Sequence, residues 1–404
     1  MRLRTSDGRA LWLGYGMNVH AGGSLDVLER ALATTVVPLR DRLGVDGTMG
    51  LALRLDRGGV TDLLADEERR RLLRDTFAAL DLVPFTGNAF VVGEFHAAGT
   101  KAEVYRPTWE TPERVAYTLA FAEALAALGD GPRTLSLSTS PGSFKPFGDD
   151  AGFPARAAAR LAETARGLAD LERRTGARVR LALEPEPLCT LETTEETVAF
   201  FEGPLREALG GDEAAARHLG VCYDVCHQAV EGEDPEASLS RLAAARIPVV
   251  KVQVSCALLV PDPADPAARA ALARFDEPRW LHQVASGTGA SRRLVADLPE
   301  ALSGPAAPAW RAAGPWRVHF HVPVHRAEVV PPLRTTRDVL ERALRAVVRT
   351  GACDHLEIET YTWEGLPADA RAGGLVESIA REHEWVLSVL AEEGVAPDAE
   401  EDPR

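Results

Sequence analysis

The chain has 404 residues, with 60 acidic side chains against 45 Lys and Arg, so its formal net charge is -15. This acidic balance argues against a surface that follows nucleic-acid phosphates and favours small molecules and metal cations as partners. The length allows either one large α/β barrel or several smaller domains.

The chain shows no pattern of a secreted or membrane-inserted protein. The first residues, MRLRTSDGRALWLGYG, lack the long apolar region of a secretory signal, and no run reaches the roughly 18 apolar residues of a membrane span. The five cysteines are an odd number, which suits a reducing compartment. We therefore expect a cytoplasmic protein without disulfides.

Short apolar or alternating runs alternate with amphipathic helical stretches, which favours βα units and a parallel sheet. The predicted strands are residues 13–20, 50–55, 81–90, 133–140, 178–185, 219–224, 248–255, 317–324 and 355–361. The predicted helices are residues 25–43, 66–80, 112–128, 154–176, 194–209, 335–350 and 372–393. This order predicts an α/β fold, a (β/α)8 TIM barrel with an insertion near the seventh strand.

Nine predicted strands exceed the eight of such a barrel, and the excess follows residue 255. Residues 256–316 are rich in Pro, Ala and Gly, so we expect an inserted segment over the barrel mouth, with 317–324 returning the chain to the seventh-strand region. The predicted domain is 1–394, and 395–404 is expected to be a disordered acidic tail.

Acidic residues end three of the predicted strands, where a parallel barrel gathers its site. Glu184 closes the strand RVRLALE before Pro185, although Glu186 is a rival that the sequence does not exclude. Asp224 ends LGVCYD and His227 follows; Asp224 alone fits a helix cap as well as a ligand. In LEIETY, Glu357 and Glu359 share one face, and a cation or a paired base is the simplest reason for two carboxylates in a barrel core.

Polar side chains also share one face on two other predicted strands. VVKVQVS aligns Lys251, Gln253 and Ser255, and RVHFHVPV aligns His319 with His321. Two imidazoles in step suit a metal or substrate clamp. Loop residues at the ends of the earlier strands complete the candidates for substrate binding, which are His20, Asn88, His96, Lys145, His227 and His319.

Several runs together resemble the xylose isomerase-like TIM barrels, a superfamily of sugar phosphate isomerases and epimerases, and most closely its EboE-type metabolite traffic proteins. The runs are MNVHAGGSLDVLE, FTGNAFVVGEFH, LSTSPGSFKP, LEPEPLCTLE, GVCYDVCHQAV, KVQVSCAL, HFHVPVH and HLEIETYTWEGLP. The resemblance implies one divalent metal ion (Mn, Mg, Co or Zn) on Glu184, Asp224 and Glu359, with Gln253 or His321 as the fourth ligand. It also implies that Glu184 and Glu359 are the catalytic acid and base and that His227 contacts substrate.

These observations predict a metal-dependent isomerase or epimerase of a small sugar-like or cyclitol-like metabolite, with partners from the same gene cluster. Two alternatives stay open. One is a carrier that holds a metabolite in the same pocket without turnover, and the other is a phosphodiesterase similar to endonuclease IV. The sequence does not give the substrate, the metal or the oligomeric state.

Overall fold

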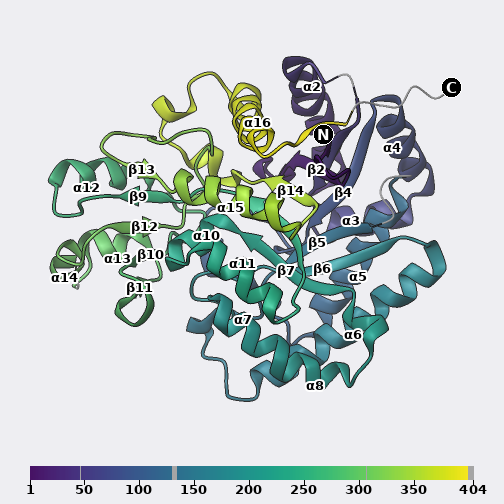
Figure 1. Ribbon diagram of the computed structural model, residues 1–404, viewed down its shortest axis with the longest axis horizontal. Helices are drawn as coiled ribbons and strands as arrows, with labels where there is room; N and C mark the ends of the chain where they lie inside the picture. The colour runs from purple at the N-terminus through teal and green to yellow at the C-terminus, as the bar shows by residue number, and fades with distance from the viewer. Residues whose placement is uncertain (46, 130–133, 306, 399–404) are drawn as a thin grey trace.

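The computed structural model describes residues 1–404 except 46, 130–133, 306 and 399–404 (Figure 1). Its main sheet has the strand order β15-β1-β2-β14-β8-β7-β6-β5-β4-β3. The strands are β1 (Arg2–Arg4), β2 (Ala10–Tyr15), β3 (Met49–Leu53), β4 (Leu82–Asn88), β5 (Thr134–Thr139), β6 (Arg178–Leu183), β7 (Leu219–Asp224), β8 (Val249–Val254), β14 (His355–Ile358) and β15 (Ala396–Pro397).

Eight of these ten strands are parallel, and the first and last of the eight approach each other. Only β15 and β1 pair antiparallel; the other described strands of the sheet, from β2 through β14 and β8 to β3, pair in parallel. A parallel bridge between Gly16 and Ala52 brings the first and last of the eight strands together. Glycine permits this approach, because a Cβ atom on Gly14 would lie 2.8 Å from the carbonyl oxygen of Gly50. The predicted α/β barrel is confirmed.

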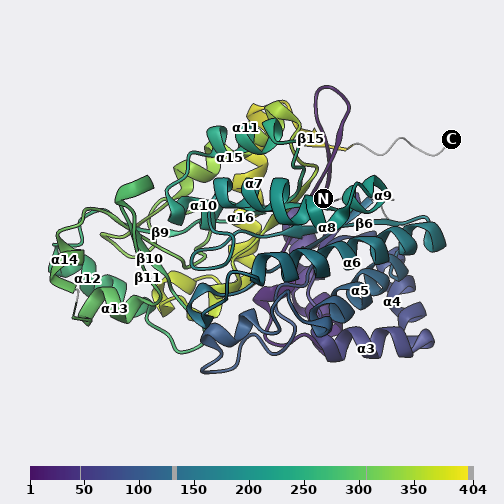
Figure 2. The same cartoon turned by 90° about the horizontal axis from the view of Figure 1, so that it is seen from below.

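Helices surround the parallel strands, as Figures 1 and 2 show. They are α1 (Leu25–Ala31), α2 (Val37–Leu43), α3 (Arg57–Ala65), α4 (Glu67–Ala79), α5 (Pro112–Ala127), α6 (Phe153–Thr175), α7 (Thr194–Phe200), α8 (Arg206–Leu209), α9 (Glu213–Ala216), α10 (Val225–Glu231), α11 (Pro235–Ala244), α15 (Arg337–Thr350) and α16 (Leu375–Glu392). The long ones match the predictions closely. The sequence did not reveal α10, because all of its residues are buried and no apolar stripe marks it.

A second, five-stranded antiparallel sheet lies beside the barrel, at the left of Figure 1, in the order β11-β10-β12-β9-β13. Its strands are β9 (Leu258–Val260), β10 (Val284–Ser286), β11 (Arg293–Val295), β12 (Trp316–Val318) and β13 (Arg334–Thr335), and the helices α12 (Pro266–Leu272), α13 (Leu298–Ser303) and α14 (Ala307–Arg311) accompany it.

The predicted strand 317–324 is wrong in extent and in place. Only its first two residues lie in a strand, β12, which pairs with β9 and β10 in the second sheet. In the barrel, β8 pairs directly with β14, so no further strand enters between them. The backbone of 319–324 instead contacts loops: the amide of His319 donates to the carbonyl of Gln283, and that of Val322 to the carbonyl of Cys256. Alternation alone could not distinguish this segment from a strand.

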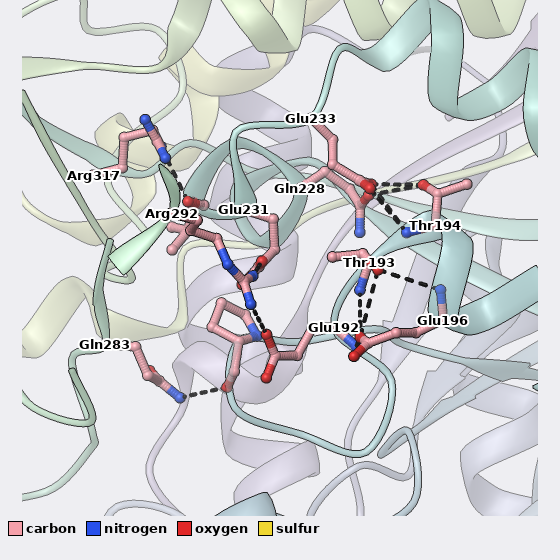
Figure 3. Close-up of polar contacts among 12 residues, drawn as sticks. Glu192, Thr193, Thr194, Glu196, Gln228, Glu231, Glu233, Gln283, Arg292 and Arg317 are labelled. Atoms are coloured by element: carbon pink, nitrogen blue, oxygen red, sulfur yellow. Dashed lines mark hydrogen bonds and ion pairs between the residues drawn. The ribbon is translucent and has the colours of Figure 1, made fainter. Parts of the chain in front are cut away.

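Buried ion pairs and backbone contacts join the second sheet to the barrel (Figure 3). Arg292 contacts the carboxylates of Glu192 and Glu231, both of which are buried. Arg317 of β12 donates to the carbonyl of Val230 in α10 at 3.0 Å. Since these contacts come from the loop after β6 and from α10, the second sheet is fixed against the mouth of the barrel, the side where the carboxyl ends of β6 and β7 lie.

The end of the chain and the cysteines complete the description. Of the predicted disordered tail, Ala396 and Pro397 pair with β1 and Asp398 pairs with Arg2, while 399–404 lie outside the described residues. The five cysteines are buried and free. None of the helices in the described part of the chain is long and apolar enough to cross a membrane.

Candidate metal centre and its cavity

Three carboxylates meet where β6, β7 and β14 end. Glu184 and Glu359 directly follow β6 and β14, and Asp224 is the last residue of β7. One oxygen of each lies within 4.8 Å of the others, and all three side chains are buried. The structure therefore brings together the three acidic residues that the sequence selected, at the end of a parallel barrel that usually carries the site.

Some carboxylate oxygens of these three residues accept hydrogen bonds from the protein, and others have no partner. Oδ1 of Asp224 accepts from the Ser255 hydroxyl at 2.8 Å and from the His227 amide at 2.9 Å, whereas its Oδ2 has no hydrogen-bond partner. Oε2 of Glu184 is likewise buried without a partner. Buried carboxylate oxygens without partners are costly, and a divalent cation would satisfy them together. The donor set thus fits a metal ion.

Glu359 is oriented by two amides. Its Oε1 accepts from Nδ2 of Asn18 at 2.7 Å and from Nδ2 of Asn88 at 3.1 Å. Both amides come from the barrel mouth, Asn18 after β2 and Asn88 at the end of β4. With Oε1 held in this way, Oε2 of Glu359 stays available for a metal ion or for a proton.

His321 lies beside Asp224, and these two residues and His227 can share one ligand position. Its Nδ1 lies 3.0 Å from the carbonyl oxygen of Glu359, so Nδ1 carries the proton and Nε2 keeps its lone pair. Nε2 is buried without a partner, 3.9 Å from Oδ2 of Asp224. Gln253, on β8, also has two buried side-chain atoms without partners. Amides bind divalent metals less strongly than a prepared imidazole does, so we favour His321.

We expect His321→Ala to weaken the binding of Mn²⁺ by about 100-fold, equivalent to about 2.7 kcal/mol, and Gln253→Ala to weaken it by less than about 5-fold. Calorimetric titration of Mn²⁺ into the metal-free proteins measures both constants. The reverse order of the two effects would assign the fourth position to Gln253.

A chain of hydrogen bonds joins two further histidines, His227 and His319, to the loop after β6. His227 donates from Nδ1 to the carbonyl of Pro185 at 3.0 Å, and its Nε2 lies 3.1 Å from Nε2 of His319. Nδ1 of His319 lies 2.7 Å from Oε1 of Gln283, whose Nε2 donates to the carbonyl of Pro187. Because both Nδ1 atoms are donors, the contact between the two Nε2 atoms requires one extra proton or a bound polar group.

Glu186, the rival of Glu184, belongs to this second group. Its Oε1 accepts from the Tyr105 hydroxyl at 2.5 Å, and it lies 3.6 Å from Nδ1 of His319. Glu186 can share a ligand position with His227 and His319 but is not in the group of Glu184, Asp224 and Glu359. The structure therefore separates the two glutamates that the sequence could not distinguish.

Burial and the charges of neighbouring groups shift the pKa values of the three carboxylates in different directions. Burial, and then the charge of Asp224, raise the pKa of Glu184 to about 8. The same two causes, together with Glu184, raise the pKa of Glu359 well above its ordinary value. Burial also acts on Asp224, but the imidazoles of His227 and His321 overcome it and lower its pKa. Without a cation, these shifts favour the charged form of Asp224 and the protonated forms of the two glutamates.

Glu184, Glu359, His227 and His319 line one cavity at the barrel mouth. Asn18, Asn88, Glu184, His227, His319 and Glu359 form its polar floor, and Phe90, Val91, Phe95, Trp280, Leu281 and Tyr361 form a largely apolar wall. Trp280 and Leu281 come from the segment that carries the second sheet. An enclosed floor of polar groups under an apolar wall is typical of a small-molecule site.

The other predicted substrate residues lie apart from this floor. Lys145 forms ion pairs with Glu192 at 2.7 Å and Glu196 at 2.9 Å. His20 contacts the Tyr15 hydroxyl at 3.1 Å. His96 makes edge-to-face contacts with Phe95 and Trp280, and Trp280 lines the cavity. Of the six predicted substrate residues, the structure brings only Asn88, His227 and His319 to the cavity lining that it describes.

Four lining or supporting residues were not recognised in the sequence: Arg54, Tyr105, Trp280 and Gln283. Arg54 had a signal, because a charged residue interrupts the apolar run GLALRL at the end of a strand. The other three lie in loops or beside the second sheet, where no periodicity marks them.

The comparisons with known proteins agree with this architecture. No protein-family model and no curated protein matches the chain. Among solved structures, a xylose isomerase-like TIM barrel protein from Mycobacterium smegmatis in complex with magnesium is 12% identical, with a TM-score of 0.50 over 95% of this chain and 97% of that one. An L-ribulose 3-epimerase is 14% identical (TM-score 0.49, 95% of each chain), and the IOLI protein with a bound zinc atom is 14% identical (TM-score 0.48, 95% and 99%). At such identities the likeness concerns the fold alone.

Proposed function

We propose that the protein is a metal-dependent isomerase or epimerase of a small sugar-like or cyclitol-like metabolite. The observation that carries the proposal is the group of Glu184, Asp224 and Glu359, of which Glu184 and Glu359 line the cavity. Glu184 and Asp224 each have an unpartnered oxygen, and His321 has an unpartnered Nε2. Such donors suit one divalent cation, and the same carboxylates can move protons.

When bound by Glu184, Asp224, Glu359 and His321, a Mn, Mg, Co or Zn ion would polarise a substrate carbonyl and the hydroxyl beside it. The protein itself provides the acid and the base. Glu184 and Glu359 come from β6 and β14, which β7 and β8 separate, so they approach the cavity from different sides. One carboxylate removes the proton from the carbon next to the carbonyl, and the other returns a proton.

The neighbouring groups hold the substrate. Asn18 and Asn88 fix the position of Glu359, so its free oxygen faces the reacting carbon. His227 and His319 offer ring nitrogens to substrate hydroxyls, and the apolar wall excludes water from the transferred proton. Ser255 holds Asp224 as a ligand rather than as a base, because its hydroxyl occupies one carboxylate oxygen.

The biological setting is part of the proposal. The resemblance to EboE-type metabolite traffic proteins supports a role in making or exporting a metabolite together with products of neighbouring genes. The five free, buried cysteines support work in a reducing cytoplasm. A carrier with the same cavity would bind such a metabolite without exchanging its protons.

Proton exchange separates an enzyme from a carrier. In D₂O with Mn²⁺, we expect the protein to place deuterium at a carbon beside the carbonyl of at least one member of a panel of ketopentoses, ketohexoses and inososes. EDTA should stop this incorporation, and Mn²⁺ should restore it, as NMR or mass spectrometry can measure. Binding of a panel member without any incorporation would support the carrier and overturn the enzyme.

A further inference from the structure

Arg54 is a buried cation that lacks a counter-ion. It follows β3 directly, at the barrel mouth, and only 6% of its surface is exposed. Its Nη2 donates to the carbonyl of Gly93 at 2.8 Å, but its Nη1 is buried without a hydrogen-bond partner. Arg54 makes no ion pair with any acidic residue in the described part of the chain. A guanidinium in this state is costly, because burial removes its water without replacing it by an anion.

The surrounding residues leave space for this group rather than neutralising it. A Cβ atom on Gly23 would lie 2.9 Å from Nη1 of Arg54, so the glycine makes room for the guanidinium. His96, whose two ring nitrogens are buried without partners, lies close enough for Arg54 to contribute, after burial, to lowering its pKa. The site therefore contains one unpaired cation and two open imidazole nitrogens.

The other cation of the cavity is already satisfied. Nζ of Lys101 donates to the carbonyls of Trp280 at 2.8 Å and Glu277 at 3.2 Å, and pairs with Asp297 at 2.8 Å. Lys101 thus has three partners within the protein, whereas Arg54 has one. Among the described cavity residues, the open donor suited to an anion is Arg54.

The position of Arg54 defines which part of a ligand it could meet. In the order of the barrel, β3 stands opposite β7, which carries Asp224. Arg54 nevertheless lines the same cavity as Glu184 and Glu359, two of the proposed metal ligands. A single small molecule can therefore reach both, with its carbonyl at the carboxylates and another substituent at the guanidinium.

We propose that Arg54 binds an anionic group of the substrate, a carboxylate or a phosphate, across the cavity from the metal ligands. This inference rests on the proposed isomerase or epimerase function, which makes the ligand a substrate. It restricts that substrate to sugar or cyclitol acids or phosphates. The planar guanidinium matches both anions in two-point hydrogen bonds. A neutral sugar would leave the cation unpaired.

Anion binding to the metal-free protein tests the proposal. Thermal unfolding is followed in EDTA at constant ionic strength, with inorganic phosphate or acetate replacing chloride. We expect phosphate, acetate or both to raise the unfolding temperature of the wild type. Arg54→Met should lose this rise, Arg54→Lys should keep part of it, and Arg57→Met, which changes an exposed arginine three residues away, should keep it fully.

The two anions distinguish the two substrate groups. A rise in unfolding temperature with acetate indicates that Arg54 binds a carboxylate, and a rise with phosphate alone indicates that it binds a phosphate. Equal responses of Arg54→Met and the wild type, or no response of the wild type to either anion, would overturn the proposal. The measurement uses neither metal nor turnover. If the Mn²⁺-dependent proton exchange is not observed, the anion-binding proposal for Arg54 is unaffected. If anion binding is not observed, the isomerase proposal is unaffected.

Discussion

Replacing Glu184 or Glu359 by Gln is expected to reduce the Mn²⁺-dependent exchange of substrate protons by roughly 10²- to 10⁴-fold, the range that one acid or base contributes. Gln keeps the shape of the side chain and can still occupy the cavity, but it cannot accept the proton. Both side chains are buried and have raised pKa values, so removing their charge should not unfold the barrel. Deuterium incorporation measures the loss, and circular dichroism checks the fold.

Glu186→Gln provides the matched control for this pair. Glu186 is buried in the same cavity and lies two residues from Glu184, but its carboxylate accepts from Tyr105 and it is not in the group of three. We expect Glu186→Gln to raise KM more than it lowers kcat, because it supports the residues that hold substrate. If Glu186→Gln abolished exchange while Glu184→Gln retained it, the base would be Glu186 and our assignment would be wrong.

The sequence predicted the centre of the site because its geometry follows from strand periodicity. Glu184, Asp224 and Glu359 each end a strand, and a parallel barrel necessarily gathers such positions at one mouth. The side-chain alternation in each strand also fixed which residue faced inward. Local pattern did not separate Glu184 from Glu186, and the resemblance to the xylose isomerase-like barrels made that choice.

The other residues of the site depend on contacts between segments that are distant in sequence. His321 reaches the Glu359 carbonyl from an irregular segment after β12, and Gln283, the residue before β10, contacts His319. The alternation of the histidine run predicted a barrel strand, but the antiparallel pairing of β12 with β9 overrides it. Propensity is a weak guide where tertiary pairing decides the backbone. Arg54 was overlooked for another reason, since its importance lies in the absence of a counter-ion.

The two acidic residues on one face of β14 illustrate how the barrel treats different buried charges. Glu357 forms an ion pair with Lys251 of β8, and both side chains are fully buried. Lys251 also donates to the carbonyl of Gly87 and to the Ser138 hydroxyl, each at 3.1 Å. Burial would lower the pKa of Lys251, but Glu357 overcomes it and raises that pKa, so the lysine is charged. Glu357 has its paired base, and Glu359 is left for the cation.

Breaking this pair should strongly destabilise the fold. We expect Lys251→Met or Glu357→Gln alone to lower the free energy of unfolding by about 3–5 kcal/mol, because each leaves the other group uncompensated in the barrel interior. The double variant Lys251→Met with Glu357→Leu should recover most of that loss, since it buries no charge. Urea unfolding followed by fluorescence measures the three values.

The same variants separate stability from metal binding. Arg42→Met, which removes an exposed ion pair with Glu377, should cost less than about 1 kcal/mol and serves as the surface control. The folded double variant should still bind Mn²⁺, because the four proposed ligands do not include Lys251 or Glu357. A double variant that is less stable than either single variant would show that the pair is favourable beyond its desolvation, contrary to our expectation. Loss of Mn²⁺ binding in a stable double variant would place Glu357 among the ligands.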